Sequence, residues 1–201
     1  MRPFFIAAAM CLSLGSCATG SHPMSGADAF YFNGLWRLCG NAYEGRVVSN
    51  DPADAQFANQ RLVMHVRECS ESDGWESEVR ISFHVGENRS RTWVISRVAT
   101  GLRLKHDHRH EDGSEDALTQ YGGDTIQGTG NPRRVEFPAD DFSKELFRAN
   151  NIPASVDNVW AMEIEPGRIF AYELRRPNRH FRVEFDLTRP VPAPPPPWGA
   201  D

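Results

Sequence analysis

The sequence WAMEIEPGRIFAYELRRPNRHFRVEFDL occupies residues 160–187 and contains three consecutive strand patterns. In each of them apolar and polar residues alternate, which is typical of a β-strand with one buried face and one face in water. Residues 165–168 and 176–179 separate the strands and contain proline, glycine and asparagine, which favour turns. Strands joined by such short turns pair side by side in opposite directions. The segment therefore predicts an antiparallel meander.

The same alternation marks earlier parts of the chain, and there we expect strands over 34–39, 42–48, 60–69, 75–85, 90–98, 102–110 and 133–137. One short helix is expected near 140–150, because Asp140 or Asp141 suits its N-cap and Phe142, Leu146 and Phe147 share a face. About nine or ten strands linked mainly by short turns predict a mainly β protein. We expect the meander to close into an up-and-down barrel or to fold into a sandwich.

The start of the first expected strand carries the residues Gly34-Leu35-Trp36. They resemble the Gly-x-Trp motif of the calycins, the superfamily of lipocalins and related barrels. The resemblance implies an up-and-down, calycin-like barrel in which Trp36 closes one end. It also implies that an arginine from a late strand covers the tryptophan, and Arg179 or Arg182 could supply it.

Composition excludes several classes of protein. The 201 residues include 22 Lys plus Arg and 27 Asp plus Glu, which gives a formal charge of −5 and excludes a basic nucleic-acid-binding arm. Hydrophobic residues make up 40% and charged residues 24%, so collagen, coiled coil and disorder throughout the chain are excluded too. The length allows one domain or two small ones.

The first residues have the features of an export signal. Arg2 precedes an apolar run over 4–14, which is shorter than the roughly 20 residues that cross a bilayer as a helix. Leu14-Gly15-Ser16-Cys17 resembles the lipobox of bacterial lipoproteins, in which cleavage precedes a cysteine that becomes lipidated. The alternative is an ordinary signal peptide that is cleaved after Ala18, for example. In the lipoprotein family the residue after the cysteine influences sorting, and Ala18 there implies the outer membrane.

These features predict a cell-envelope lipoprotein that faces the periplasm, and otherwise a soluble periplasmic or secreted protein. Removing residues 1–16 leaves a charge of 21 − 27 = −6, so we expect the lipid alone to attach the protein to the membrane. With Cys11 removed and Cys17 lipidated, Cys39 and Cys69 remain, and two cysteines in an oxidising compartment predict a disulfide.

The sequence predicts that the chain divides into four parts. We expect a signal peptide over 1–16, a flexible tether over 17–29, a single antiparallel β domain over 30–188 and a tail over 189–201. The tail contains six prolines and predicts a disordered, solvated segment in polyproline II conformation.

Gly122 and Gly123 are expected in a hairpin turn, and Glu163 and Glu165 in cross-strand ion pairs on the solvated face.

A row of histidines provides the candidate site. In a strand over 102–110, His106, His108 and His110 lie on the same face as two leucines and extend that face toward the strand end. At most two of these imidazoles could bind one metal ion, because three span about 13 Å along a strand. Further ligands would come from the set Asp112, Glu115, Asp116, His65 and His84. A pocket for an organic or anionic ligand and a solvated sheet edge are the alternatives.

No familiar catalytic motif accompanies the histidines: the chain lacks a Gly-x-Ser-x-Gly elbow, a phosphate-binding loop and a His-Glu-x-x-His helix. We therefore expect a non-enzymatic module that binds a small apolar or amphipathic ligand or interacts with other proteins, without a nucleic-acid partner. The alternative is a His-dependent metal-binding protein, with a divalent metal as cofactor, or a small enzyme.

Overall fold

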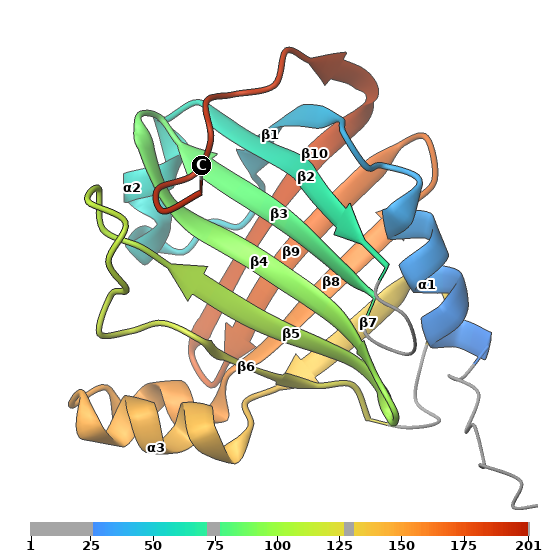
Figure 1. The fold of residues 1–201 in the computed structure, drawn as a ribbon. Helices are drawn as coiled ribbons and strands as arrows, with labels where there is room; N and C mark the ends of the chain where they lie inside the picture. The colour runs from blue at the N-terminus through green and yellow to red at the C-terminus, as the bar shows by residue number, and fades with distance from the viewer. Residues whose placement is uncertain (1–25, 72–76, 127–130, 201) are drawn as a thin grey trace, which may run out of the picture.

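The computed structural model describes residues 26–71, 77–126 and 131–200 (Figure 1). With η for a 3-10 helix, the elements in chain order are α1 (Gly26–Trp36), β1 (Ala42–Val47), η1 (Pro52–Asp54), α2 (Ala55–Ala58), β2 (Leu62–Ser70), β3 (Glu78–Val85), β4 (Asn88–Val98), β5 (Gly101–His108), β6 (Tyr121–Asp124), β7 (Arg134–Pro138), α3 (Asp141–Ala149), η2 (Pro153–Asp157), β8 (Val159–Glu165), β9 (Ile169–Arg176) and β10 (Arg179–Val191).

The ten strands form one antiparallel sheet in the order β6-β5-β4-β3-β2-β1-β10-β9-β8-β7. Consecutive strands are paired from β1 to β6 and from β7 to β10, β6 and β7 are not paired, and β1 is also paired with β10. The first and last strands thus join the two halves of the meander, and the sheet curls into a nearly closed up-and-down barrel (Figure 1). The mainly β fold, the barrel, the helix near 140–150 and the meander over 160–187 are confirmed.

The seam of the barrel lies between β6 and β7, and the start of α3 holds it together. The Gly122 N–H donates to the hydroxyl of Ser143 (2.7 Å), and the Asp140 N–H donates to the Gly122 carbonyl (2.9 Å). A Cβ atom on Gly123 would lie 1.8 Å from the Pro138 carbonyl oxygen, so only glycine allows the two strands to come this close. Gly122 and Gly123 therefore belong to β6, and the expectation of a hairpin turn there was wrong.

The interior of the barrel is filled with aromatic and aliphatic side chains from alternate strand positions. Trp93 stacks on Phe83 (5.0 Å between ring centroids) and on Tyr172 (4.4 Å), and Phe185 and Phe170 pack beside it. All of these rings are buried. Because protein interiors pack to crystal-like density, this aromatic layer makes the centre of the barrel a core.

A helix covers each end of the barrel. At one end α1 buries Tyr31 and Leu35 completely, and Arg97 at the end of β4 lies over the ring of Phe32 (5.8 Å). At the other end, where β3 ends and β4 begins, Phe57 of α2 contacts Phe83 and Phe181 at 6.4 and 5.0 Å between ring centroids.

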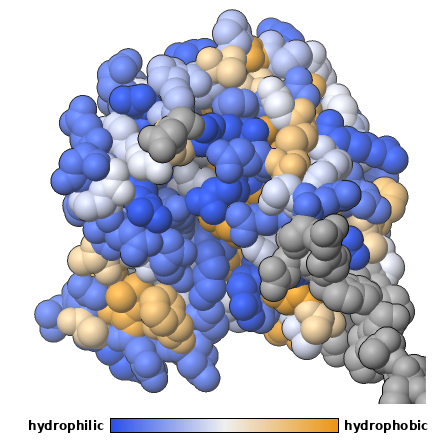
Figure 2. Space-filling view, in the orientation of Figure 1, coloured by the Kyte–Doolittle hydropathy of each residue, from blue (hydrophilic) through white to orange (hydrophobic). Residues whose placement is uncertain are grey.

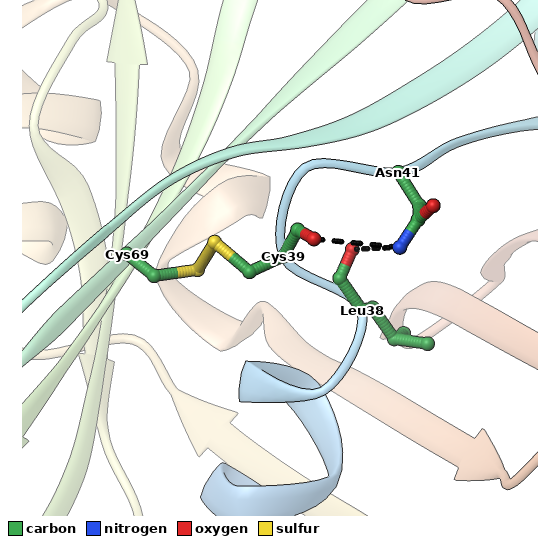
Figure 3. Close-up of a disulfide and its surroundings, with 4 residues drawn as sticks. All are labelled: Leu38, Cys39, Asn41 and Cys69. Carbon is green, nitrogen blue, oxygen red and sulfur yellow. Dashed lines mark hydrogen bonds between the residues drawn. A yellow bond between two sulfur atoms is a disulfide. The ribbon is translucent and has the colours of Figure 1, made fainter.

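The disulfide ties the α1 end to the wall. Cys39, after α1, is bonded to Cys69 of β2, as the sequence predicts, with 6.3 Å between their Cα atoms. Figure 3 shows how Asn41 braces this turn: its side-chain amide donates to the carbonyls of Leu38 and Cys39, both at 3.3 Å. The Gly40 N–H donates to the Val66 carbonyl of β2 (2.7 Å). The helix that covers this end is thus fixed covalently and by hydrogen bonds.

Several expectations about the N-terminal part of the domain were wrong. The strand expected over 34–39 is instead the end of α1 and a turn, so Gly34-Leu35-Trp36 lies in a helix. Arg179 forms ion pairs with Asp51 and Asp54 at the opposite end of the barrel from α1, so it does not cover Trp36. Arg182 lies on the outer face, because only odd-numbered side chains of β10 point inward there. The structure instead places Arg97 over Phe32.

The ends of the chain also differ from expectation. Residues 26–29 of the expected tether form the first turn of α1, whereas residues 1–25, with the signal, the lipobox and Cys17, lie outside the described residues. The tail expected to be disordered begins as the last residues of β10, and residues 192–200 then return across the outer face of the barrel (Figure 1). Long-range contacts hold it there: the Trp198 N–H donates to the Arg89 carbonyl (3.1 Å).

The outer face of the last four strands carries the expected cross-strand ion pairs. Arg182 pairs across strands with Glu163 (3.1 Å) and Glu173 (3.3 Å), and within β10 with Glu184 (2.9 Å). Glu165 instead pairs with Arg168 in the following turn, so the cross-strand expectation was wrong for this residue. No helix among residues 26–71, 77–126 and 131–200 is long and apolar enough to cross a membrane.

Candidate functional site

The orientation of β5 determines which of the three histidines point into the barrel. Leu102, Leu104 and His106 point into the barrel and are buried, so the predicted face is confirmed for this part of the strand. His108 is half-buried at the end of β5. His110 follows the strand and is exposed, because the chain turns away at Gly113, whose φ is +84°. The inward row therefore contains two histidines rather than three.

His106 is fully engaged by its neighbours. Its Nδ1 atom lies 3.1 Å from the Tyr121 carbonyl oxygen and its Nε2 atom 2.8 Å from the Tyr172 hydroxyl. A carbonyl oxygen can only accept, so Nδ1 carries the proton and Nε2 accepts the hydrogen bond from Tyr172. The ring also stacks on Tyr121 (4.5 Å between centroids) and lies beside Trp160 (5.1 Å). The lone pair that a metal ion needs is therefore already used.

Burial keeps this imidazole neutral. It lowers the pKa of His106 to about 3, and the neighbouring His108 contributes in the same direction. Burial also raises the pKa of the Tyr121 and Tyr172 phenols above their usual values. The cluster is thus a neutral hydrogen-bonded group at pH 7, and its pKa values lie too far from neutrality for efficient acid–base catalysis.

His108 and Arg91 form the outer part of the cluster. They stand opposite each other in the β4–β5 ladder, and the Tyr121 hydroxyl lies 3.5 Å from His108 Nε2. Burial, followed by the charge of Arg91, lowers the pKa of His108 to about 4. The Arg91 guanidinium donates to the side chain of Asn88 (2.9 Å) and lies over Phe57 (5.8 Å). Arg91 therefore places a positive charge beside His108, under the helix α2.

The acidic candidates lie outside the barrel and stabilise the loop after β5. Asp112 is exposed and accepts from the Ser114 N–H (2.9 Å), and Asp116 accepts from the Leu118 N–H (2.7 Å). Glu115 pairs with Arg109 (3.2 Å). These carboxylates shape a turn, and the described residues contain no group of three or more His, Cys, Asp or Glu that could hold a metal ion.

The distant histidines belong to another surface. His65 and His84 lie on the outer face of β2 and β3, on the other side of the barrel wall from His106. The Nε2 atom of His84 is 3.1 Å from the Ser82 hydroxyl. Burial, and then the charges of Arg89 and His65, lower the pKa of His84 to about 4. The structure therefore does not bring His65 or His84 to the histidine row.

The sequence did not predict three residues of the histidine cluster: Arg91, Tyr121 and Tyr172. Alternation along 90–98 contains a signal for the first of them, because Arg91 has the same parity as Trp93 and Ile95. Tyr121 of β6 lies opposite His106 in the β5–β6 ladder, whereas Tyr172 comes from β9, which pairs with β8 and β10. The contact between Tyr172 and His106 depends on barrel closure, which no local pattern contains.

The hollows described for this chain lie outside the core. One of about 580 Å³ lies between β1 and β10, where the register shifts between Tyr43 and Gly45. Another of about 280 Å³ lies at the rim beside η1 and α2.

Comparison of the chain with protein-family models, curated proteins and solved structures gave no match. Fold and geometry therefore define the class, a ten-stranded up-and-down barrel with a filled interior and a buried, neutral His–Tyr cluster.

Proposed function

We propose that the protein is an exported lipoprotein, anchored through Cys17 in the outer membrane and facing the periplasm. In this proposal the barrel is a rigid, non-enzymatic module that interacts through its outer surface. The lipobox resemblance supports the anchor, and the Cys39–Cys69 disulfide fits an oxidising compartment. Ala18 after the cysteine supports the outer membrane, by the resemblance to other lipoproteins.

The packed core is the observation that carries the interaction role. A barrel that carries an apolar ligand inside needs an unfilled centre, whereas here Trp93, Tyr172 and Phe185 fill it and α1 and α2 cover both ends. A small amphipathic ligand would therefore bind on the wall or the rim. The visible outer surface is largely hydrophilic, with an apolar area over α3 (Figure 2), where Phe142 and Ile152 are exposed.

The anchor is tested by membrane fractionation of the full chain. Cys17→Ser should move the protein from the membrane to the periplasmic fraction, because the lipid alone attaches it. The matched control is Cys11→Ser, a cysteine inside the apolar run, which should leave the protein in the membrane. Unchanged partition of Cys17→Ser would refute lipidation at this residue.

The interaction role is tested by native mass spectrometry of the protein purified from its own envelope. We expect the mass of the mature chain and its lipid, without a small molecule in equimolar amount. A stoichiometric small molecule that survives dialysis would overturn the proposal in favour of a ligand carrier. One equivalent of zinc or copper, lost in a His106→Ala/His108→Ala variant, would overturn it in favour of the metal site.

A further inference from the structure

The segment after β10 forms a strap across the outer wall of the barrel; the strap is residues 192–200. It contains the four consecutive prolines 194–197 and ends close to the start of β4 and the loop after β5 (Figure 1). Pro197 is buried. A proline run of this kind favours the extended polyproline II conformation, which loses little entropy when it docks. The strap therefore lies on the wall as a bound peptide would.

The strap has a specific floor, which we call the outer groove: Ser82 of β3, Thr92 of β4 and Asp107 of β5. All three side chains point outward, and in an uncovered barrel wall they would face water. Instead they are 1%, 7% and 7% exposed and line a space of about 30 Å³ together with Pro197 and Trp198. The strap thus covers a polar groove in the middle of three strands.

Charged neighbours make the outer groove rigid. The Asp107 carboxylate is bridged by two guanidinium groups, that of Arg80 (2.7 Å) and that of Arg109 (2.7 Å). Arg109 also binds Glu115 of the loop after β5. Because charge-assisted hydrogen bonds hold each of these side chains in place, the groove has a fixed shape.

Main-chain hydrogen bonds hold the strap at one point. The Trp198 N–H donates to the Arg89 carbonyl and the Arg89 guanidinium donates to the Pro196 carbonyl, both at 3.1 Å. Arg89, at the start of β4, thus forms hydrogen bonds with the strap backbone on both sides of Pro197. This pairing requires an extended chain whose residue after the prolines has a free N–H.

A glycine contact adds selectivity. Gly199 has a φ of +77°, and a Cβ atom there would lie 3.1 Å from the Gly113 carbonyl oxygen and 3.3 Å from the aliphatic carbons of Arg109. A larger residue would therefore be strained in its backbone and would push the strap off the loop. The indole N–H of Trp198 is buried without a hydrogen-bond partner among the described residues. The fit is therefore specific in shape but leaves one donor unpaired.

We propose that the outer groove is a recognition site for an extended, proline-rich segment that ends in Trp-Gly. The chain's own strap occupies the site in cis, and a partner protein with a segment of the same chemistry competes for it. This inference rests on the proposed interaction role and names its surface and the kind of partner.

The test measures binding of a fluorescein-labelled peptide with the sequence of residues 192–201 by anisotropy. A flexible tether gives an effective concentration of about 1 mM, so a seated strap requires a Kd for the free peptide below about 1 mM. We expect a chain ending at Val191 to bind the peptide, and the full chain to bind it at least tenfold more weakly. Peptides with Trp198→Ala or Gly199→Val should bind the truncated chain at least tenfold more weakly.

A second variant keeps the test valid if truncation prevents folding. Gly199→Val in the full chain should release the strap while leaving every residue of the barrel unchanged. This variant should therefore bind the peptide as tightly as the truncated chain. The control Pro195→Ala changes an exposed strap residue and should bind it as weakly as the wild type.

The proposal is overturned if the folded Gly199→Val variant binds no peptide up to 1 mM, or if the wild type binds it equally well. A dimer that exchanges straps would overturn the cis assignment. These measurements use purified protein, so a failure here leaves the lipidation test untouched, and a failure of lipidation leaves the peptide result valid.

Discussion

The Nε2 atom of His106 lies 2.8 Å from the hydroxyl of Tyr172, and this bond joins β5 to β9 across the interior of the barrel. The two strands are far apart in the sheet order, so the bond crosses the core. It exists only while the imidazole is neutral, because Nε2 must keep its lone pair to accept from the phenol. The stability of the core is thereby linked to pH.

The first prediction concerns this pH dependence. The pKa of His106 is about 3 in the folded protein against 6.5 for a free histidine, so below pH 6.5 only the unfolded chain binds the proton. The contribution of neutral His106 to the unfolding free energy is therefore complete above pH 6.5. It decreases as the pH falls toward 3, by about 1.4 kcal/mol per pH unit. Between pH 6.5 and 5 the loss is about 2 kcal/mol.

Urea unfolding at pH 7 and pH 5 measures this loss. In His106→Gln the difference in unfolding free energy between the two pH values should be about 2 kcal/mol smaller than in the wild type. His110→Gln is the control, because His110 is exposed beyond the end of β5, and it should keep the wild-type difference. An unchanged difference in His106→Gln would contradict the buried, neutral imidazole.

The sequence predicts the parts of this fold in which neighbouring residues carry the signal. Alternation over 160–187 and the turns at Gly167 and Asn178, both with positive φ, are local, and β8, β9 and β10 follow them. The inward direction of His106 follows from the same parity. These features need no knowledge of what packs on them.

The missing parts depend on distant contacts. In α1 apolar residues lie on every side, with Phe30 exposed and Tyr31 buried, so no helical period separates it from a strand. The strap docks because Arg89 and Gly113 meet residues about 100 positions away, which composition alone does not predict. Tyr121 meets His106 in the β5–β6 ladder, but Tyr172 of β9 reaches it only when the barrel closes.

The second prediction concerns the seam between β6 and β7. Ser143→Ala removes the acceptor of the buried Gly122 N–H, and a buried donor without a partner costs about 1–3 kcal/mol. Ser143 is completely buried, so water does not replace the hydroxyl. Urea unfolding should show this loss, whereas the exposed Ser114→Ala should change stability by less than about 0.5 kcal/mol. Equal stability of both variants would show that Ser143 does not hold the seam.

The third prediction concerns the disulfide. It closes a loop of 30 residues, and the chain-entropy estimate gives a contribution of about 3–4 kcal/mol. Cys39→Ser/Cys69→Ser should therefore unfold at lower urea concentration than the wild type. Dithiothreitol should lower the wild type to the level of the variant and leave the variant unchanged. A wild type that is insensitive to the reductant would mean that the bond contributes little.

The fourth prediction compares two glycines that the structure places in opposite environments. Gly34 lies inside α1, and an alanine Cβ there would meet only Ile164 at 3.9 Å, an ordinary contact. Gly34→Ala should therefore raise the unfolding free energy by about 0.5–1 kcal/mol, the usual difference between glycine and alanine in a helix. In Gly123→Ala the new Cβ would overlap the Pro138 carbonyl, so β6 and β7 must separate.

Urea unfolding of the two alanine variants distinguishes a helical Gly34 from a glycine at the start of a strand. Because separation of the seam also breaks the bonds around Gly122, we expect Gly123→Ala to lose at least about 3 kcal/mol. A loss of stability in Gly34→Ala would contradict its place in α1, since a glycine that alanine cannot replace needs either a positive φ or a close neighbour. Neither is present at Gly34, whereas Gly123 has the close neighbour. The opposite signs of the two changes thus test the end cap and the seam of the same barrel.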